Sequence, residues 1–259
     1  MLSRYACFPG ILFCLASLAL GECCVAAETA IAARSSGGSG GKTGTFANEQ
    51  IKVGDKQRAY RLVVPKKLDP TRPAPMVFAF HGLGDSKDLM SFYSQLDRLA
   101  AKQNYILVYL NGKDRYWPLV VEWAKDDLAF FDALYAQLGQ SYNLDLNRVY
   151  LVGFSNGAYF SHLVASQRSD KVAAIAAHSG GLGLLRDDPQ LKHKYAVLLI
   201  HGDADVIVKV KESREAQVAY QKWKHAVEYV EVPKLNHFWA HGVKVNEQIA
   251  AFFAKHALQ

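Results

Sequence analysis

Residues 148–157 read RVYLVGFSNG, an apolar run that ends in a G-x-S-x-G motif. Residues 158–168 come next and can form a helix, so the motif lies where a strand passes into a helix. A serine at the tip of such a sharp turn projects its hydroxyl into solvent, and the flanking glycines let neighbouring backbone approach closely. The context predicts Ser155 as a nucleophile, although the motif taken alone also fits a simple glycine-rich turn.

Seven short apolar runs alternate with helix-like stretches along the chain. Several are apolar throughout, which is typical of strands buried on both faces of a parallel sheet. Apolar residues at helical spacing over 128–138 and 247–258 predict helices that pack on this sheet. The predicted strands are 60–64, 76–80, 105–110, 149–154, 172–177, 196–200 and 227–232. The alternation predicts an α/β fold with a mostly parallel central sheet flanked by helices on both faces, and no insertion is long enough for a lid domain.

The first 45 residues differ in composition from the rest. Residues 1–27 combine Arg4, an apolar run over 8–20 and small residues up to Ala27, which is the pattern of a secretory signal peptide; an uncleaved anchor is the alternative. Residues 28–45 are rich in glycine and serine and predict a flexible linker. We therefore expect residues 46–259 to form one catalytic domain, secreted or periplasmic, with no membrane span in the mature protein.

Cysteine use and charge narrow the class of protein. All 4 cysteines lie within residues 1–27, so the mature chain would have neither a disulfide nor a thiolate metal ligand. The formal net charge is +6, which scattered solvated lysines explain. No alternation of aromatic and basic residues points to nucleic acid, and the predicted chemistry calls for no metal or organic cofactor.

Two later segments offer the acid and the base that activate a serine. The loop 201–205 follows an apolar strand and contains Asp203 and Asp205. We expect Asp205 to orient the histidine, with Asp203 as the competitor, because Asp beside Gly also favours a turn. His237 is the predicted general base, since it lies on a short loop directly after the last strand.

The remaining site residues are oxyanion donors and an aromatic wall. The loop that begins at His81 follows a strand. We expect the backbone N–H of Leu83 in this loop and that of Asn156 to form an oxyanion hole. We expect Tyr116, Trp117 and Trp239 to contact an acyl group or a sugar ring, although ordinary packing also accounts for such side chains.

The order Ser155, Asp205, His237 resembles that of the α/β-hydrolase superfamily, over nearly all of residues 50–257. The segments 153–157, 126–131 and 201–208, with His237 and Trp239, look like the secreted polyhydroxybutyrate depolymerase and feruloyl or acetylxylan esterase group. Residues 81–86 are instead similar to the opening motif of the carboxylesterase and acyl-protein thioesterase group. Val208-Lys209 stands where the depolymerase-like enzymes usually have a proline, which leaves the choice of substrate open.

The resemblance implies a secreted serine hydrolase that cleaves carboxylic esters in two steps through an acyl-enzyme. The implied substrates include polymer-linked esters of the feruloyl, acetyl-polysaccharide or polyhydroxyalkanoate type. A serine peptidase of the same fold is one alternative, and it would need a charged anchor for a peptide terminus. A non-catalytic binding protein that keeps the fold is the other, and a fluorophosphonate probe distinguishes it from an enzyme. The sequence does not predict an oligomeric state.

Overall fold

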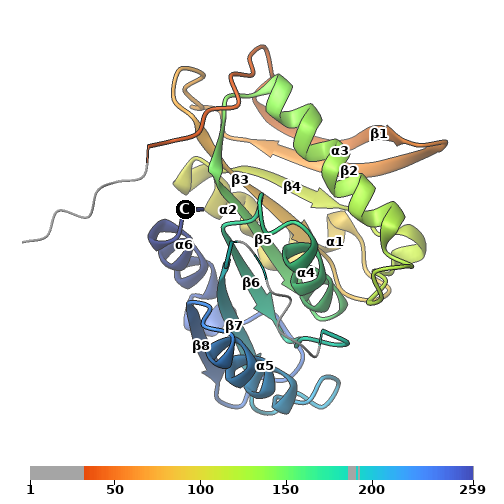
Figure 1. Ribbon diagram of the computed structural model, residues 1–259, viewed down its shortest axis with the longest axis vertical. Helices are drawn as coiled ribbons and strands as arrows, with labels where there is room; N and C mark the ends of the chain where they lie inside the picture. The colour runs from red at the N-terminus through yellow and green to blue at the C-terminus, as the bar shows by residue number, and fades with distance from the viewer. Residues whose placement is uncertain (1–31, 186–190, 192, 259) are drawn as a thin grey trace, which may run out of the picture. The chain divides into compact units, whose positions relative to one another are not determined.

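A single eight-stranded sheet forms the centre of the structure, a computed structural model that describes residues 32–185, 191 and 193–258 (Figure 1). The strands lie in the order β1-β2-β4-β3-β5-β6-β7-β8. Strands β3 to β8 pair in parallel, whereas β1 pairs with β2, and β2 with β4, in antiparallel fashion. Their bounds are β1 Gly44–Val53, β2 Lys56–Val64, β3 Ala74–Phe80, β4 Ile106–Leu110, β5 Leu144–Phe154, β6 Ala174–His178, β7 Ala196–Gly202 and β8 Val227–Val232.

Helices cover both faces of the sheet. One apolar cluster joins the sheet to α3, α4 and α5, and a second joins its other face to α1, α2 and α6. The α-helices are α1 Lys87–Ser94, α2 Leu96–Gln103, α3 Lys125–Ser141, α4 Asn156–Gln167, α5 Lys211–Lys222 and α6 Val245–Lys255, and the short 3₁₀ turns are η1 Lys113–Arg115 and η2 His241–Val243. The predicted α/β fold with a mostly parallel, two-sided sheet is confirmed, and the described residues contain no large lid.

The central strands bring the predicted site segments to one edge. Every residue of β3, β6 and β7 is buried, as expected for strands covered by helices on both sides. In the register of the sheet, Phe80 at the end of β3 pairs with Gly153 near the end of β5, and His178 at the end of β6 pairs with Ile200 in β7. The loops that carry the candidate catalytic residues therefore leave the sheet along its carboxyl edge, where ligands bind in open α/β sheets.

The N-terminal segment differs from the expected linker where the structure describes it. Ser36 N donates to Leu144 O at 2.9 Å, and Gly41 N donates to Ser141 O at 2.8 Å. A Cβ on Gly38 would lie 2.3 Å from the carbonyl oxygen of Gly139, so glycine lets this segment pack closely against the end of α3. Residues 35–41 are thus attached to the domain, and β1 begins at Gly44, two residues before the predicted start of the catalytic domain. The predicted signal peptide, residues 1–27, lies outside the described residues.

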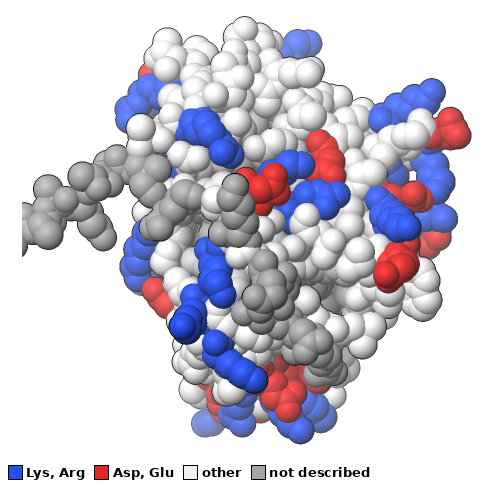
Figure 2. All heavy atoms as spheres, in the orientation of Figure 1, with Lys and Arg blue, Asp and Glu red and all other residues white. Residues whose placement is uncertain are grey.

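Surface charge is mixed. Figure 2 shows Lys and Arg side chains interspersed with Asp and Glu on one face. Ion pairs join Arg168 to Asp132 and Arg214 to Glu231, at 2.7 and 2.6 Å. Within residues 32–185, 191 and 193–258, no helix is both long enough and apolar enough to cross a bilayer.

Candidate active site

Ser155 occupies a strained turn between β5 and α4. Its φ of 53° and ψ of −119° lie in a region that non-glycine residues seldom adopt. The backbone N–H of Ser155 donates to His178 O at 2.9 Å, which ties the turn to the neighbouring strand β6. Such a turn lifts the serine side chain clear of the sheet at the start of the helix, as a nucleophile elbow requires.

Both glycines of the motif are needed for this turn to fit. A Cβ on Gly153 would lie 2.1 Å from the carbonyl oxygen of Gly157, and a Cβ on Gly157 would lie 2.1 Å from the carbonyl oxygen of Phe80. Neither contact is possible for a real side chain, because the obstructing atoms are backbone. The glycine spacing thus reflects close approach of β3, β5 and α4 around Ser155.

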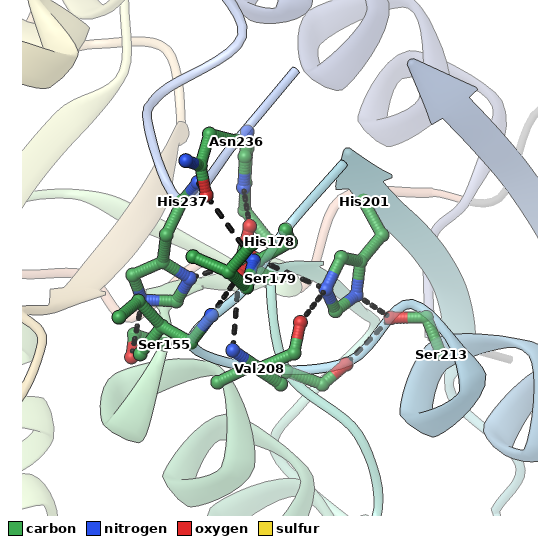
Figure 3. A network of polar contacts seen from close by, with 12 residues as sticks. Ser155, His178, Ser179, His201, Val208, Ser213, Asn236 and His237 are labelled. Carbon is green, nitrogen blue, oxygen red and sulfur yellow. Dashed lines mark hydrogen bonds and ion pairs between the residues drawn. The ribbon is translucent and has the colours of Figure 1, made fainter. Parts of the chain in front are cut away.

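Ser155, His237 and Asp205 form a continuous hydrogen-bonded chain, of which Figure 3 labels Ser155 and His237. His237 Nε2 lies 2.9 Å from Ser155 Oγ, and His237 Nδ1 lies 2.7 Å from Asp205 Oδ2. A carboxylate can only accept, so Nδ1 carries the hydrogen and Nε2 is free to accept the serine proton. The three residues come from the ends of β5, β7 and β8, far apart in sequence and adjacent at the sheet edge.

The loop after β7 holds the carboxylate of Asp205 in place. Asp205 Oδ1 accepts from the backbone N–H groups of Ile207 and Val208, both at 2.9 Å. Burial opposes ionisation of Asp205, but the hydrogen bonds from His237 and from these amides outweigh it and lower the pKa of the carboxyl group. Asp203 is exposed and accepts from the backbone N–H of Lys234 at 2.6 Å, which is a turn-stabilising role. The geometry thus favours Asp205 over Asp203 as the partner of the histidine.

Asn236 connects the acid loop to the base. Its Oδ1 accepts from the N–H of Val206 at 3.2 Å and from that of His237 at 2.8 Å. On the opposite side, the ring of Phe154 packs against the ring of His237, with 5.0 Å between centroids. Asn236 was not predicted as a site residue, and its position directly before the predicted base is the only signal of it in the sequence.

Two backbone amides are available near the hydroxyl of Ser155. The Cβ position of Gly82 would lie 3.5 Å from Ser155 Cβ, so the loop that carries Leu83 runs beside the serine. Asn156 is the first residue of α4, where an N–H has no partner within the helix. Among the described residues, no hydrogen bond uses the N–H of Leu83 or Asn156. Both predicted oxyanion donors are therefore free to bind a ligand oxygen.

The predicted aromatic wall is largely wrong. Trp117 is fully buried, its ring stacks on Phe160 at 4.8 Å, and its Nε1–H donates to His81 O at 2.9 Å. Trp239 is also buried and stacks on the ring of His178 at 4.9 Å. Both indoles are packed against other aromatic rings and cannot contact a substrate. Of the three predicted wall residues, only Tyr116, at 38% exposed, is accessible to solvent.

His178 is a second histidine below the base, and it is neutral. Burial lowers the pKa of His178 to about 3. Its Nε2 accepts from the N–H of Ala240 at 3.1 Å, and its Nδ1 lies 3.0 Å from Ser179 Oγ. This side chain therefore fixes the loop that carries His237 without adding charge to the site.

Within the described part of the chain, no three His, Cys, Asp or Glu side chains cluster to hold a metal ion.

Comparison with known proteins supports the fold. The chain matches the phospholipase/carboxylesterase family over residues 129–256, which include Ser155, Asp205 and His237. Among solved structures, it resembles a thermostable esterase with a TM-score of 0.65 and 19% identity, covering 82% of this chain and 63% of that one. A ferulic acid esterase from Anaeromyces mucronatus gives a TM-score of 0.61 and 18% identity, covering 76% and 85%.

The chain has the α/β-hydrolase fold and resembles the carboxylesterase group. This α/β-hydrolase is 29% identical over 172 residues to NocK, a proposed esterase of Nocardia uniformis subsp. tsuyamanensis, covering 62% of the chain and 49% of NocK. It is 26% identical over 206 residues to feruloyl esterase D of Neurospora crassa, covering 74% of the chain and 69% of that protein. A bifunctional acetylxylan esterase/xylanase of Neocallimastix patriciarum is 28% identical over 123 residues, and the match spans 48% of the chain and only 18% of that protein. The α/β-hydrolase thus spans about half, or less, of the length of two of these relatives.

Proposed function

We propose that this α/β-hydrolase is a serine esterase in which Ser155 is the nucleophile, His237 the general base and Asp205 the orienting acid. The observation that carries the proposal is the chain of contacts at 2.9 and 2.7 Å from Ser155 Oγ through His237 to Asp205 Oδ2. A hydroxyl, an imidazole and a carboxylate in this order generate an activated serine on many unrelated folds.

The proposed reaction has two steps. His237 Nε2 accepts the proton of Ser155 as Oγ attacks the ester carbonyl, and the amides of Leu83 and Asn156 bind the oxyanion that forms. The protonated His237 then donates to the leaving alcohol oxygen, and the C–O bond to the alcohol breaks. In the second step His237 activates a water molecule, which releases the acid and restores Ser155.

The rim of the site supports substrates with a bulky apolar part. Four apolar side chains with exposed fractions of 62% to 70% belong to the loops of the site: Leu83, Val206, Ile207 and Phe238. Leu83 is itself a proposed oxyanion donor, and the other three lie one or two residues from Asp205 or His237. Exposed apolar side chains that gather around a polar centre are typical of a binding surface. With the feruloyl and acetylxylan esterase relatives, this rim favours aromatic or polymer-linked esters as the substrate class.

Export to the cell surface or beyond is part of the proposal. Residues 1–27 have the composition of a signal peptide, and all 4 cysteines lie within them, so the domain would remain intact in either redox compartment. A secreted or periplasmic location would bring the site to polymeric esters outside the cell. The proposed catalytic domain, residues 46–259, would act with the segment over residues 35–41 attached.

Hydrolysis of an ester panel by the wild type and by Ser155→Ala tests the proposal. The panel contains short and medium p-nitrophenyl esters, methyl ferulate, acetylated xylan, a hydroxybutyrate oligomer and a p-nitroanilide peptide. We expect ester turnover that disappears in the variant, with methyl ferulate or acetylated xylan preferred over the peptide. Preference for the p-nitroanilide would support a serine peptidase instead. Absence of turnover together with absence of fluorophosphonate labelling in the wild type would support a binding protein.

A further inference from the structure

Asp205 faces two histidines. Oδ2 of Asp205 lies 2.7 Å from His237 Nδ1 and 3.3 Å from His201 Nε2. The side chains of Asp205 and His201 are fully buried, whereas that of His237 is 16% exposed. His201 is the last residue but one of β7, four residues before Asp205, so the strand end and the acid loop fold back on each other (Figure 3).

The surroundings of His201 Nε2 decide where its hydrogen lies. Besides Asp205, this nitrogen contacts the carbonyl oxygen of Val208 at 2.9 Å. A carbonyl and a carboxylate have no hydrogen to give, and a bare imidazole nitrogen that faced both would be left buried and unsatisfied. Nε2 of His201 therefore carries a hydrogen, which it donates to Val208 O and shares with Asp205 Oδ2.

The other edge of the ring is fixed as firmly. His201 Nδ1 lies 2.6 Å from Ser213 Oγ, and Ser213 Oγ lies 2.7 Å from Gly180 O. Ser213 belongs to α5, and Gly180 follows β6, so this chain of contacts crosses three elements of the fold. All of these groups are buried, which leaves the ring of His201 no freedom to turn.

We propose that His201 is a positioning residue for the triad, which holds the turn over residues 205–208 and aims Asp205 Oδ2 at His237. Val208 takes part twice, because its N–H donates to Asp205 Oδ1 while its carbonyl accepts from His201. The acid is thus held by the backbone on one oxygen and by two histidines on the other. Only the predicted effect of His201 on turnover rests on the proposed esterase function; its hydrogen bonds do not.

Few other charged or titratable groups act on this ring. His178 on β6 is neutral, because burial lowers its pKa to about 3, and its nitrogens are bonded to Ala240 and Ser179. Glu231 on β8 pairs with His201 in the sheet register, but its carboxylate is bonded to Arg214. Asp205 is therefore the carboxylate that His201 contacts directly.

Matched variants test the donor at Nε2. Glutamine places an amide nitrogen near the position of a histidine Nε2, whereas asparagine reaches only the position of Nδ1. We expect His201→Asn to lower kcat/KM about 100-fold, mostly through kcat, because the catalytic acid loses its alignment. We expect His201→Gln to remain within about tenfold of the wild type, since one donor still aligns the acid.

The pH profile separates positioning from packing. When Asp205 loses its alignment, it stabilises the imidazolium of His237 less, so the acid limb of kcat/KM should move to lower pH in His201→Asn. His162→Gln is the control, because His162 is equally buried but is bonded to Tyr220 instead of the triad. His162→Gln should leave the limb in place. A wild-type profile in His201→Asn would overturn the proposal.

A nuclear magnetic resonance measurement needs no turnover and no variant that folds poorly. In long-range ¹H–¹⁵N spectra of the wild-type protein, we expect His201 Nε2 to appear protonated and His237 Nε2 to appear bare at neutral pH. A bare His201 Nε2 would overturn the positioning role even in an active esterase. If His201 Nε2 is protonated but the protein hydrolyses no ester, the hydrogen-bond assignment is right and the proposed function is wrong.

Discussion

Asn156 and Trp117 bind each other through two hydrogen bonds. The N–H of Trp117 donates to Asn156 Oδ1 at 2.8 Å, and Asn156 Nδ2 donates to the carbonyl oxygen of Trp117 at 2.9 Å. The side chain of Asn156 is thus locked to the loop after β4, while its backbone N–H remains free beside Ser155. The indole Nε1–H of Trp117 in turn donates to His81 O at the start of the loop that carries Leu83, so one buried residue links both proposed oxyanion donors through its backbone and its side chain.

Replacing Asn156 by alanine should therefore affect stability and turnover together. Asn156→Ala removes both bonds and leaves the buried N–H and carbonyl of Trp117 without partners, which costs about 1–3 kcal/mol for each unsatisfied group. We expect the free energy of unfolding to fall by about 2–4 kcal/mol and kcat to fall, because the oxyanion donor loses its anchor. Urea unfolding and steady-state kinetics measure the two effects.

Tyr116→Ala is the neighbouring control. Tyr116 is 38% exposed, and its side chain has no part in the Asn156–Trp117 bonds. We expect its removal to leave the free energy of unfolding within about 0.5 kcal/mol of the wild type and to raise KM for aromatic esters. Equal effects of the two substitutions on stability would contradict the anchoring role of Asn156.

The second glycine of the motif should be intolerant of any side chain. In Gly157→Ala the new Cβ would lie 2.1 Å from the carbonyl oxygen of Phe80, and backbone must move to relieve the contact. We expect a loss of stability of more than about 3 kcal/mol, or no folded protein. Gly242→Ala is the matched control, because its Cβ would meet nothing within 4 Å. A comparable loss in Gly242→Ala would show that close approach is not the cause.

The two aspartates of the acid loop should respond very differently. Asp205→Asn keeps the shape of the side chain, but its amide can present a donor to His237 and favour the wrong tautomer. We expect kcat to fall about 10⁴-fold, as in other serine triads. Asp203→Asn keeps an oxygen for the N–H of Lys234 and should stay within about twofold of the wild type. The reverse order of effects would make Asp203 the catalytic acid.

Local sequence was sufficient to predict the central strands and the chain positions of the proposed triad. Strands such as β3 and β7 are apolar throughout because both faces are covered, and this pattern is visible without knowing the partner strands. Ser155, Asp205 and His237 each come shortly after such a strand, and the carboxyl ends of parallel strands meet at one edge. Their positions after these strands therefore predicted that the three side chains lie close together.

Elements whose pattern depends on distant partners were missed. The strand β1 mixes exposed and half-buried residues, and the helices α1 and α2 have eight residues each, too short for a clear periodicity. Glycines over residues 37–41 predicted flexibility, yet Gly38 and Gly41 fit against Tyr142 and the end of α3, about 100 residues away. The burial of Trp117 and Trp239 likewise depends on rings from other elements, which composition cannot reveal.

Buried histidines should make the fold sensitive to mild acid. Burial lowers the pKa of His162 and of His178 to about 3, whereas in the unfolded chain each would titrate near the ordinary value of 6.5. Between these values the unfolded state binds more protons than the folded state, so stability is complete above about pH 6.5 and is lost as the pH falls. Each histidine contributes a slope of about 1.4 kcal/mol per pH unit within that window.

His162→Gln isolates one of these slopes. The wild type should lose about 2 kcal/mol more unfolding free energy than this variant between pH 6 and pH 4.5, because the variant has one fewer proton to bind on unfolding. Urea unfolding at both pH values, with the same m-value, provides the measurement. The lowered pKa of Asp205 acts only below the ordinary carboxyl range and does not contribute in this window. If the wild type and His162→Gln lose the same free energy, His162 is protonated in the folded state, and the neutral, buried histidine bonded to Tyr220 is the wrong description.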